Sequence, residues 1–64
     1  MKYGVVISFN SQKGVGNIKD NRTNEEYTFS KSDCPHEVEI LDEVGYEIET
    51  ENNKTKAVKV KLSS

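Results

Sequence analysis

The chain of 64 residues contains no tryptophan and only one residue each of cysteine, histidine and proline. One cysteine excludes a disulfide within the chain, and one cysteine with one histidine does not supply the ligands of a zinc site. No apolar run is longer than residues 5–7, so the sequence predicts neither a membrane span nor the apolar centre of a secretion signal. These absences predict a cytoplasmic protein without a metal or a cofactor.

Apolar residues make up 33% of the chain, an amount that suits one small core. We therefore predict a single domain over residues 1–64, of marginal stability because so short a chain buries only about 60% of its unfolded surface. Charge is unevenly distributed, since residues 25–51 hold ten carboxylates against Lys31 whereas both ends of the chain are basic. A basic surface for nucleic acid requires that folding bring the two basic ends together. The alternative is that acidic and basic strands are neighbours and that their charges pair.

The apolar residues follow the spacing of strands. No window combines helical spacing with caps, and β-branched and aromatic residues predominate. Three strand-like runs cover residues 2–10, 15–19 and 26–30, and two more form the arms of a hairpin around Asn52-Asn53, while residues 36–41 are ambiguous. Five short strands without helices predict an all-β protein, a small barrel that closes and so leaves no sheet edges exposed.

The hairpin allows its register to be predicted, because side chains in a strand alternate with a period of two. A two-residue loop would place apolar residues opposite charged ones. We therefore predict a three-residue loop at residues 52–54 or 53–55, with Lys59 opposite Glu47 or Glu49. In this arrangement Lys59 and Lys61 pair with the glutamates of the other arm.

The run Phe9-Asn10-Ser11-Gln12-Lys13-Gly14-Val15-Gly16-Asn17-Ile18 resembles the signature of cold-shock domains, in which Trp-Phe-Asn leads through a turn to Lys-Gly-Phe-Gly-Phe-Ile. Residues 26–32 stand where that family has Asp-Val-Phe-Val-His-Phe-Ser, and residues 57–62 resemble its closing Ala-Ala-Asn-Val-x-Leu. The resemblance implies a five-stranded Greek-key barrel of the oligonucleotide/oligosaccharide-binding (OB) type. It also implies binding of single-stranded RNA or DNA, whose bases stack on aromatic side chains at the surface of such a barrel.

The sequence departs from the family at the positions of those aromatic rings. The residues found in their place are Ser8 for tryptophan, Val15 and Asn17 for two phenylalanines, and Thr28, Ser30 and Lys31 for phenylalanine, histidine and phenylalanine. A base stacked on an aromatic ring contributes ~1–3 kcal/mol, so losing three such stacks lowers affinity by about two orders of magnitude even at the lower figure. The resemblance therefore implies a barrel that has kept its interior and lost most of its stacking surface.

We therefore predict weak, sequence-tolerant binding of single-stranded nucleic acid, either RNA or DNA. The residues predicted to contact it are Lys2, Phe9, Asn10, Lys13, Asn17, Thr28, Ser30 and Lys31. Two of them have a plain structural alternative: Phe9 as a partly buried core aromatic and Lys13 as a solvated loop lysine.

A second hypothesis is that the barrel serves protein interaction or forms a homodimer. If Val6 points inward, Val5 and Ile7 point outward on the same side, and Val15 on the next strand could extend this apolar surface. The alternative is that residues 36–41, with Val38 and Ile40, lie over the strand and cover it.

No enzymatic activity is predicted. Cys34-Pro35-His36 is the only pair with reactive potential, and a proline-bearing turn seldom lets a histidine reach a thiol two residues away. We expect Cys34 to be a small buried thiol instead. The stripe of Glu47, Glu49 and Glu51 offers too few converging oxygens for calcium, and pairing with lysines explains it better.

Overall fold

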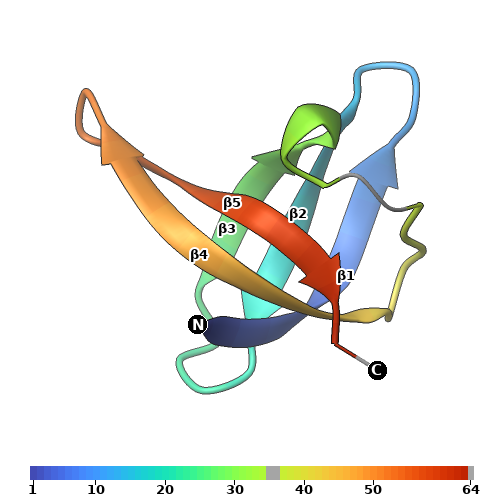
Figure 1. Cartoon of the computed structure of the whole chain (residues 1–64), viewed down its shortest axis with the longest axis horizontal. Coiled ribbons are helices and arrows are strands. Elements are labelled where there is room, and N and C mark those ends of the chain that lie inside the picture. The colour runs from blue at the N-terminus through green and yellow to red at the C-terminus, as the bar shows by residue number, and fades with distance from the viewer. Residues whose placement is uncertain (35–36, 64) are drawn as a thin grey trace.

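The computed structural model describes residues 1–34 and 37–63 and shows an all-β protein (Figure 1). Its strands are β1 (Lys2–Asn10), β2 (Val15–Asp20), β3 (Glu26–Ser30), β4 (Glu43–Glu51) and β5 (Lys54–Leu62). They close into a barrel in the order β1-β2-β3-β5-β4, with a turn of 3-10 helix, η1 (Lys31–Asp33), after β3. The predicted fold class, a small five-stranded barrel of the OB type, is confirmed.

The predicted strand limits agree closely with the structure. Strands β1 and β3 cover the predicted residues 2–10 and 26–30, and β2 extends one residue further than expected, to Asp20. In the ambiguous segment, residues 37–42 form no strand, and Pro35 and His36 lie outside the described residues. None of the described residues belongs to a helix of the length and apolar character that a membrane crossing requires.

The core is made by the inward residues of all five strands. Its largest fully buried side chains are Val6, Ile18, Phe29, Val44, Tyr46 and Val60. Phe9 is partly buried and stacks on Phe29, with 6.0 Å between ring centroids and 15° between planes. Gly16 lies opposite both rings in the sheet, where a Cβ atom would come within 2.8 Å of the Phe29 ring. The close approach of Phe29 therefore requires glycine at this position.

One end of the barrel is closed by a buried carboxylate. Asp20 is 4% exposed, and its Oδ2 atom accepts a 2.6 Å hydrogen bond from the Tyr46 hydroxyl. Its Oδ1 atom accepts the backbone N–H groups of Arg22 at 2.8 Å and Thr23 at 3.1 Å. The hydrogen bond from Tyr46, followed by that from the Arg22 backbone, lowers the pKa of Asp20 although burial acts in the opposite direction. Burial and the bond to Asp20 raise the pKa of the Tyr46 phenol.

The C-terminal hairpin has a two-residue turn, so the predicted three-residue loop is wrong. Asn52 and Asn53 both have positive φ, 52° and 64°, as a type I′ turn requires, and Glu51 lies opposite Lys54. The register is corrected further along by an extra residue, Lys59, which bulges out of β5 with φ of 52°. The predicted loop length assumed that the hairpin has no bulge. With the bulge, the hairpin can have a two-residue turn and still pair in the register that buries its apolar side chains.

The predicted pairing of Lys59 with a glutamate is confirmed, since Lys59 Nζ lies 3.8 Å from Glu47 Oε2. Its predicted place in the register is wrong, because Val58 lies opposite Glu47 and Lys56 opposite Glu49. The predicted pairing of Lys61 with a glutamate is wrong, because the bulge places Lys61 opposite Gly45. Lysines opposite glutamates are found instead near the turn, where Lys56 faces Glu49 and Lys54 faces Glu51.

We expect acid to destabilise the protein through Asp20. Its pKa in the folded protein is below the ordinary value of 3.8, so the folded state binds this proton more weakly than the unfolded state. The stabilisation of the folded state by the ionised Asp20 is therefore complete above pH 3.8. It is lost as the pH falls below that value and through the pKa of Asp20 in the folded protein. Asp20→Asn should lower the free energy of unfolding at neutral pH by about 1.5–3 kcal/mol. It should also lose less stability than the wild type between about pH 5 and pH 3, as measured by urea unfolding.

The control is Glu51→Gln, which neutralises an exposed carboxylate beside the hairpin turn. This variant should follow the acid profile of the wild type. If Asp20→Asn lost stability in parallel with the wild type, the acid sensitivity would belong to other groups.

We also expect Lys59→Gly to stabilise the protein. A left-handed backbone costs a non-glycine residue ~1–2 kcal/mol, whereas an exposed ion pair such as Lys59–Glu47 contributes about 0.2–1 kcal/mol. Removing the side chain should therefore raise the free energy of unfolding by up to about 1 kcal/mol in thermal or urea unfolding. The matched control, Lys56→Gly in a regular part of β5, should be destabilising. A Lys59→Gly variant that is less stable than the wild type would contradict the argument.

Candidate nucleic-acid interface

The outer face of β1, β2 and β3 carries a row of three polar side chains. Ser8, Asn17 and Thr28 lie side by side in the register of the sheet. The Asn17 Nδ2 atom donates to Ser8 Oγ at 3.2 Å, and Thr28 Oγ1 donates to Asn17 Oδ1 at 3.0 Å. By the resemblance described above, these three positions are those of aromatic rings in cold-shock domains. The chain therefore has a hydrogen-bonded polar row where a stacking surface is expected.

Two lysines lie together to one side of this row, in the turn after β1 and just after the end of β3. The Asn10 Oδ1 atom accepts the N–H groups of Gln12 at 3.0 Å and Lys13 at 3.1 Å and so shapes the turn between β1 and β2. Gly14 continues this turn with φ of 69°, and its carbonyl oxygen accepts the backbone N–H of Lys31 at 2.7 Å. The main chains that carry Lys13 and Lys31 are therefore held next to each other, and both lysines are exposed.

Closure of the barrel brings two further lysines to the Thr28 end of the row. Strand β3 pairs with β5 in parallel, and Thr28 is the residue of β3 that faces Lys56. A cleft of about 330 Å³ along the row is lined by Ser8, Phe9, Asn10, Lys13, Val15, Gly16, Asn17 and Thr28. A second cleft, of about 660 Å³, is lined by Thr28, Glu51, Asn52, Lys54, Thr55 and Lys56.

Thr28 lines both clefts, so together they form a polar track with Lys13 in one cleft and Lys54 and Lys56 in the other. Glu51 is the one carboxylate among the residues that line them. Lys54 and Lys56 were not among the predicted site residues. The parallel contact between β3 and β5 places them here, and no local pattern in the sequence reports that contact.

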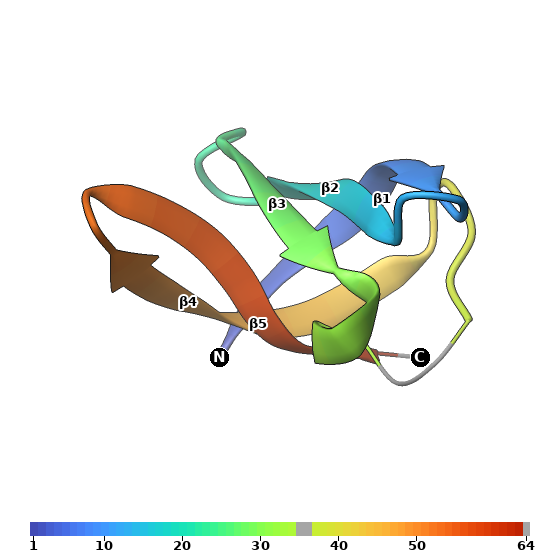
Figure 2. The ribbon, with the colours of Figure 1, turned by 90° about the horizontal axis from the view of Figure 1, so that it is seen from above.

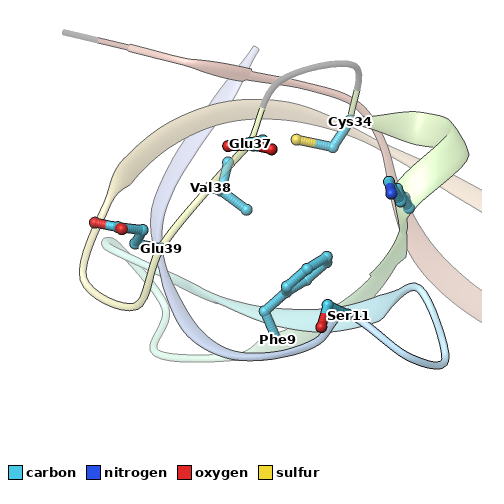
Figure 3. Close-up of a pocket in the computed structure, with 7 residues that line it drawn as sticks. Phe9, Ser11, Cys34, Glu37, Val38 and Glu39 are labelled. Atoms are coloured by element: carbon cyan, nitrogen blue, oxygen red, sulfur yellow. The ribbon is translucent and has the colours of Figure 1, made fainter.

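Phe9 occupies a different position from the polar row. Its ring turns toward the end of the barrel, where Figure 3 shows it facing the same space as the side chains of Cys34 and Val38. This space is a cleft of about 340 Å³ whose rim includes Lys31 and Glu37. Phe9 packs against the core through Phe29, so it has the position of the partly buried aromatic considered above as the alternative to base stacking.

The structure brings most of the predicted nucleic-acid residues together. Six of the eight lie on the outer face of β1–β3, in the adjoining turn or at the start of η1: Asn10, Lys13, Asn17, Thr28, Ser30 and Lys31. Within this group the Ser30 hydroxyl donates to Asp33 Oδ2 at 3.0 Å. Phe9 instead packs on the inner side of the sheet. Lys2 lies apart, opposite Tyr46 and beside the cleft around Asp20 at the other end of β1.

The three aliphatic residues of the second hypothesis lie in two places. Val6 is fully buried as predicted, and its neighbours Val5 and Ile7 are half-buried. Val15 is 38% exposed and lies opposite Asn10, whereas Val5 lies opposite Lys19. The Ser8–Asn17 pair stands between these two positions in the sheet, so Val15 does not extend a surface around Val5.

The segment after η1 lies along β1, as the alternative to an exposed apolar strand proposed. The Leu41 N–H donates to the Val6 oxygen at 2.7 Å, and the Val6 N–H donates to the Asp42 oxygen at 3.0 Å. Val38 is buried in the core, whereas Ile40 is 59% exposed. The segment therefore covers the edge of β1 with its backbone and contributes one side chain to the barrel.

Residues 1–34 and 37–63 contain no group of three His, Cys, Asp or Glu side chains placed to hold a metal ion. Cys34 is buried as predicted, while His36, which was not expected to reach its thiol, lies outside the described residues. Comparison with protein-family models and with curated proteins found no match for the chain. The likeness to cold-shock domains therefore rests on the three motifs quoted above.

Proposed function

We propose that this protein binds single-stranded nucleic acid weakly and without sequence preference along the outer face of β1, β2 and β3. The observation that supports this most is the continuous track from Lys13, over Asn17 and Thr28, to Lys56, with the Lys31 main chain held beside the turn that carries Lys13. The uneven charge distribution means that a basic surface requires residues from both basic ends of the chain. Lys13 from the first basic segment and Lys56 from the last both line this track.

In this mechanism the lysines bind phosphates, and the amide and hydroxyl groups between them bind the sugar and base edges. Asn17 uses one N–H and its oxygen within the row, which leaves its second N–H for a ligand. Few rings are available for stacking, so most of the binding free energy comes from the release of counterions. The row provides hydrogen bonds at fixed positions but no pocket that selects one base.

Protein interaction through Val5, Ile7 and Val15 is the weaker proposal. Two of these side chains are half-buried, and the third is separated from them by the polar row.

We expect binding to depend strongly on salt. Four lysines that contact a single strand give a slope of about −3 for the logarithm of the affinity against the logarithm of the salt concentration. Lys13→Ala and Lys56→Ala should each lower the slope by about 0.7 and weaken binding of a labelled oligo-pyrimidine, measured by fluorescence anisotropy. Lys61→Ala, opposite Gly45 and away from the track, is the matched control and should change neither quantity. Submicromolar binding that barely responds to salt would contradict the mechanism.

We further expect that an aromatic ring placed in the row strengthens binding. Thr28 is exposed at the centre of the track, so Thr28→Phe should be tolerated by the fold. One base stacked on the new ring contributes ~1–3 kcal/mol, so affinity for oligo-pyrimidine should rise by about 5- to 150-fold. The control is Thr23→Phe, an exposed position in the loop between β2 and β3. An equal gain at both positions, or no gain at Thr28, would exclude this face as the binding surface.

A further inference from the structure

Strand β4 continues beyond the part of it that pairs with β1. Its pairing with β1 ends where Tyr46 faces Lys2, yet its pairing with β5 continues to Glu51, opposite Lys54. Residues 47–51 therefore have β5 on one side and, within the described part of the chain, no strand on the other. Figures 1 and 2 show the consequence, since the β4–β5 hairpin projects beyond the rest of the barrel.

The backbone hydrogen bonds show which way each residue of β1 is directed. The N–H and C=O groups of Val6 both bond to residues just before β4, at Asp42 and Leu41. The Tyr3 oxygen instead accepts the N–H of Asn21, which follows β2. Alternate residues of a strand point their backbone groups to opposite sides, so the even-numbered residues at the start of β1 point toward β4.

The same alternation identifies the groups on the open side of β4. The Glu43 oxygen accepts the N–H of Ser63, which follows β5, so the odd-numbered residues of β4 point toward β5. The even-numbered residues point toward β1, and Ile48 and Thr50 are the ones that lie beyond its end. Their N–H and C=O groups form an open edge with the hydrogen-bonding pattern of a strand.

Charge defines what this edge can pair with. Glu47, Glu49 and Glu51 are exposed and alternate along β4, while Ile48 and Thr50 project from its other face. If two copies paired edge to edge, each glutamate would lie near glutamates of the other copy, which is destabilising. Lysines of β5 lie on the far side of these glutamates, so the charged side chains nearest to a strand added at the open edge are Glu47, Glu49 and Glu51. The edge therefore disfavours self-association and favours a basic partner strand.

We infer that the open edge of β4 binds an extended basic peptide, which adds to the sheet as an antiparallel strand in line with β1. Alternate lysines or arginines of the peptide would face Glu47, Glu49 and Glu51, and β-branched residues between them would lie beside Ile48 and Thr50. Strand β5 already pairs with β4 in this way, since Lys56 faces Glu49. The type I′ turn holds the projecting hairpin in a strand conformation before a peptide arrives.

The test uses the intact chain labelled with nitrogen-15 and the peptide acetyl-Lys-Thr-Lys-Val-Lys-Thr-Lys-amide. In the free protein the Ile48 and Thr50 amides should exchange rapidly with solvent, because no strand accepts their hydrogen bonds. Saturation with peptide should slow both at least tenfold, while the Glu47 and Glu49 amides, which point toward β5, should change little. Chemical-shift changes should centre on residues 47–51.

Two controls separate strand addition from attraction between charges. The same peptide N-methylated at the residues that bond to β4 keeps its charge and should not bind. Glu49→Lys should weaken binding of the unmodified peptide at least fivefold, whereas Glu26→Lys, the same charge change on β3, should leave it unaltered.

Four results would overturn the inference. They are slow exchange of Ile48 and Thr50 in the free protein, binding of the methylated peptide with equal affinity, shift changes centred on Thr28, and dimerisation of the free chain through β4. Ile48 and Thr50 lie outside the polar row of β1–β3. The oligonucleotide measurements therefore test the proposed function independently of the peptide measurements.

Discussion

The hydrogen bond from Tyr46 to Asp20 joins β4 to the last residue of β2, with β1 lying between the two strands. It satisfies two polar groups that the barrel buries, and Asp20 also holds the loop to β3 through the N–H groups of Arg22 and Thr23. A buried carboxylate is stable only when such partners surround it, so this end of the barrel has little freedom to rearrange. Gly4 makes the arrangement possible, because a Cβ atom there would lie 2.4 Å from the Lys19 oxygen.

The opposite end of the barrel is built around rings rather than charges. Phe9 and Phe29 point inward and stack on each other across Gly16. Because side chains alternate along each strand, the neighbouring residues Ser8, Asn17 and Thr28 point to the outer face. The interior and the proposed binding face are therefore two sides of the same three strands. A sheet that keeps its inward residues keeps the positions of its outward ones, even when the outward side chains change from rings to polar groups.

Two bulges adapt simple strands to this small barrel. The register of β1 shifts between Val6 and Ser8, and that of β5 shifts at Lys59. Each bulge inserts one residue and increases the local twist, which helps a short sheet to close on itself. The shift in β5 also lets the hairpin end in a two-residue turn, and the projecting hairpin then presents both the lysines beside Thr28 and the open edge at Ile48.

The sequence determined the features that depend on neighbouring residues. Strand-like runs of apolar residues predicted the limits of β1 and β3, and five short strands without helices predicted one small barrel. The resemblance to cold-shock domains implied the inward position of Val6. The motif around Phe9 and Gly14 identified the end of the sheet where most candidate contacts gather. These signals are local, because a period of two and a turn of known composition are complete within a few residues.

Only the tertiary structure decided the features that join distant parts of the chain. Asp20 has a loop-like sequence context and is buried because Tyr46 reaches it from 26 residues away. Lys56 belongs to the proposed site because β3 meets β5 in parallel, and Lys61 faces Gly45 because one extra residue bulges at Lys59. A shift of one residue reassigns every pair beyond it, and its cost is set by packing across the whole barrel. The pattern along one strand therefore predicts on which face of the sheet each side chain lies, but not which residue of the next strand lies opposite it.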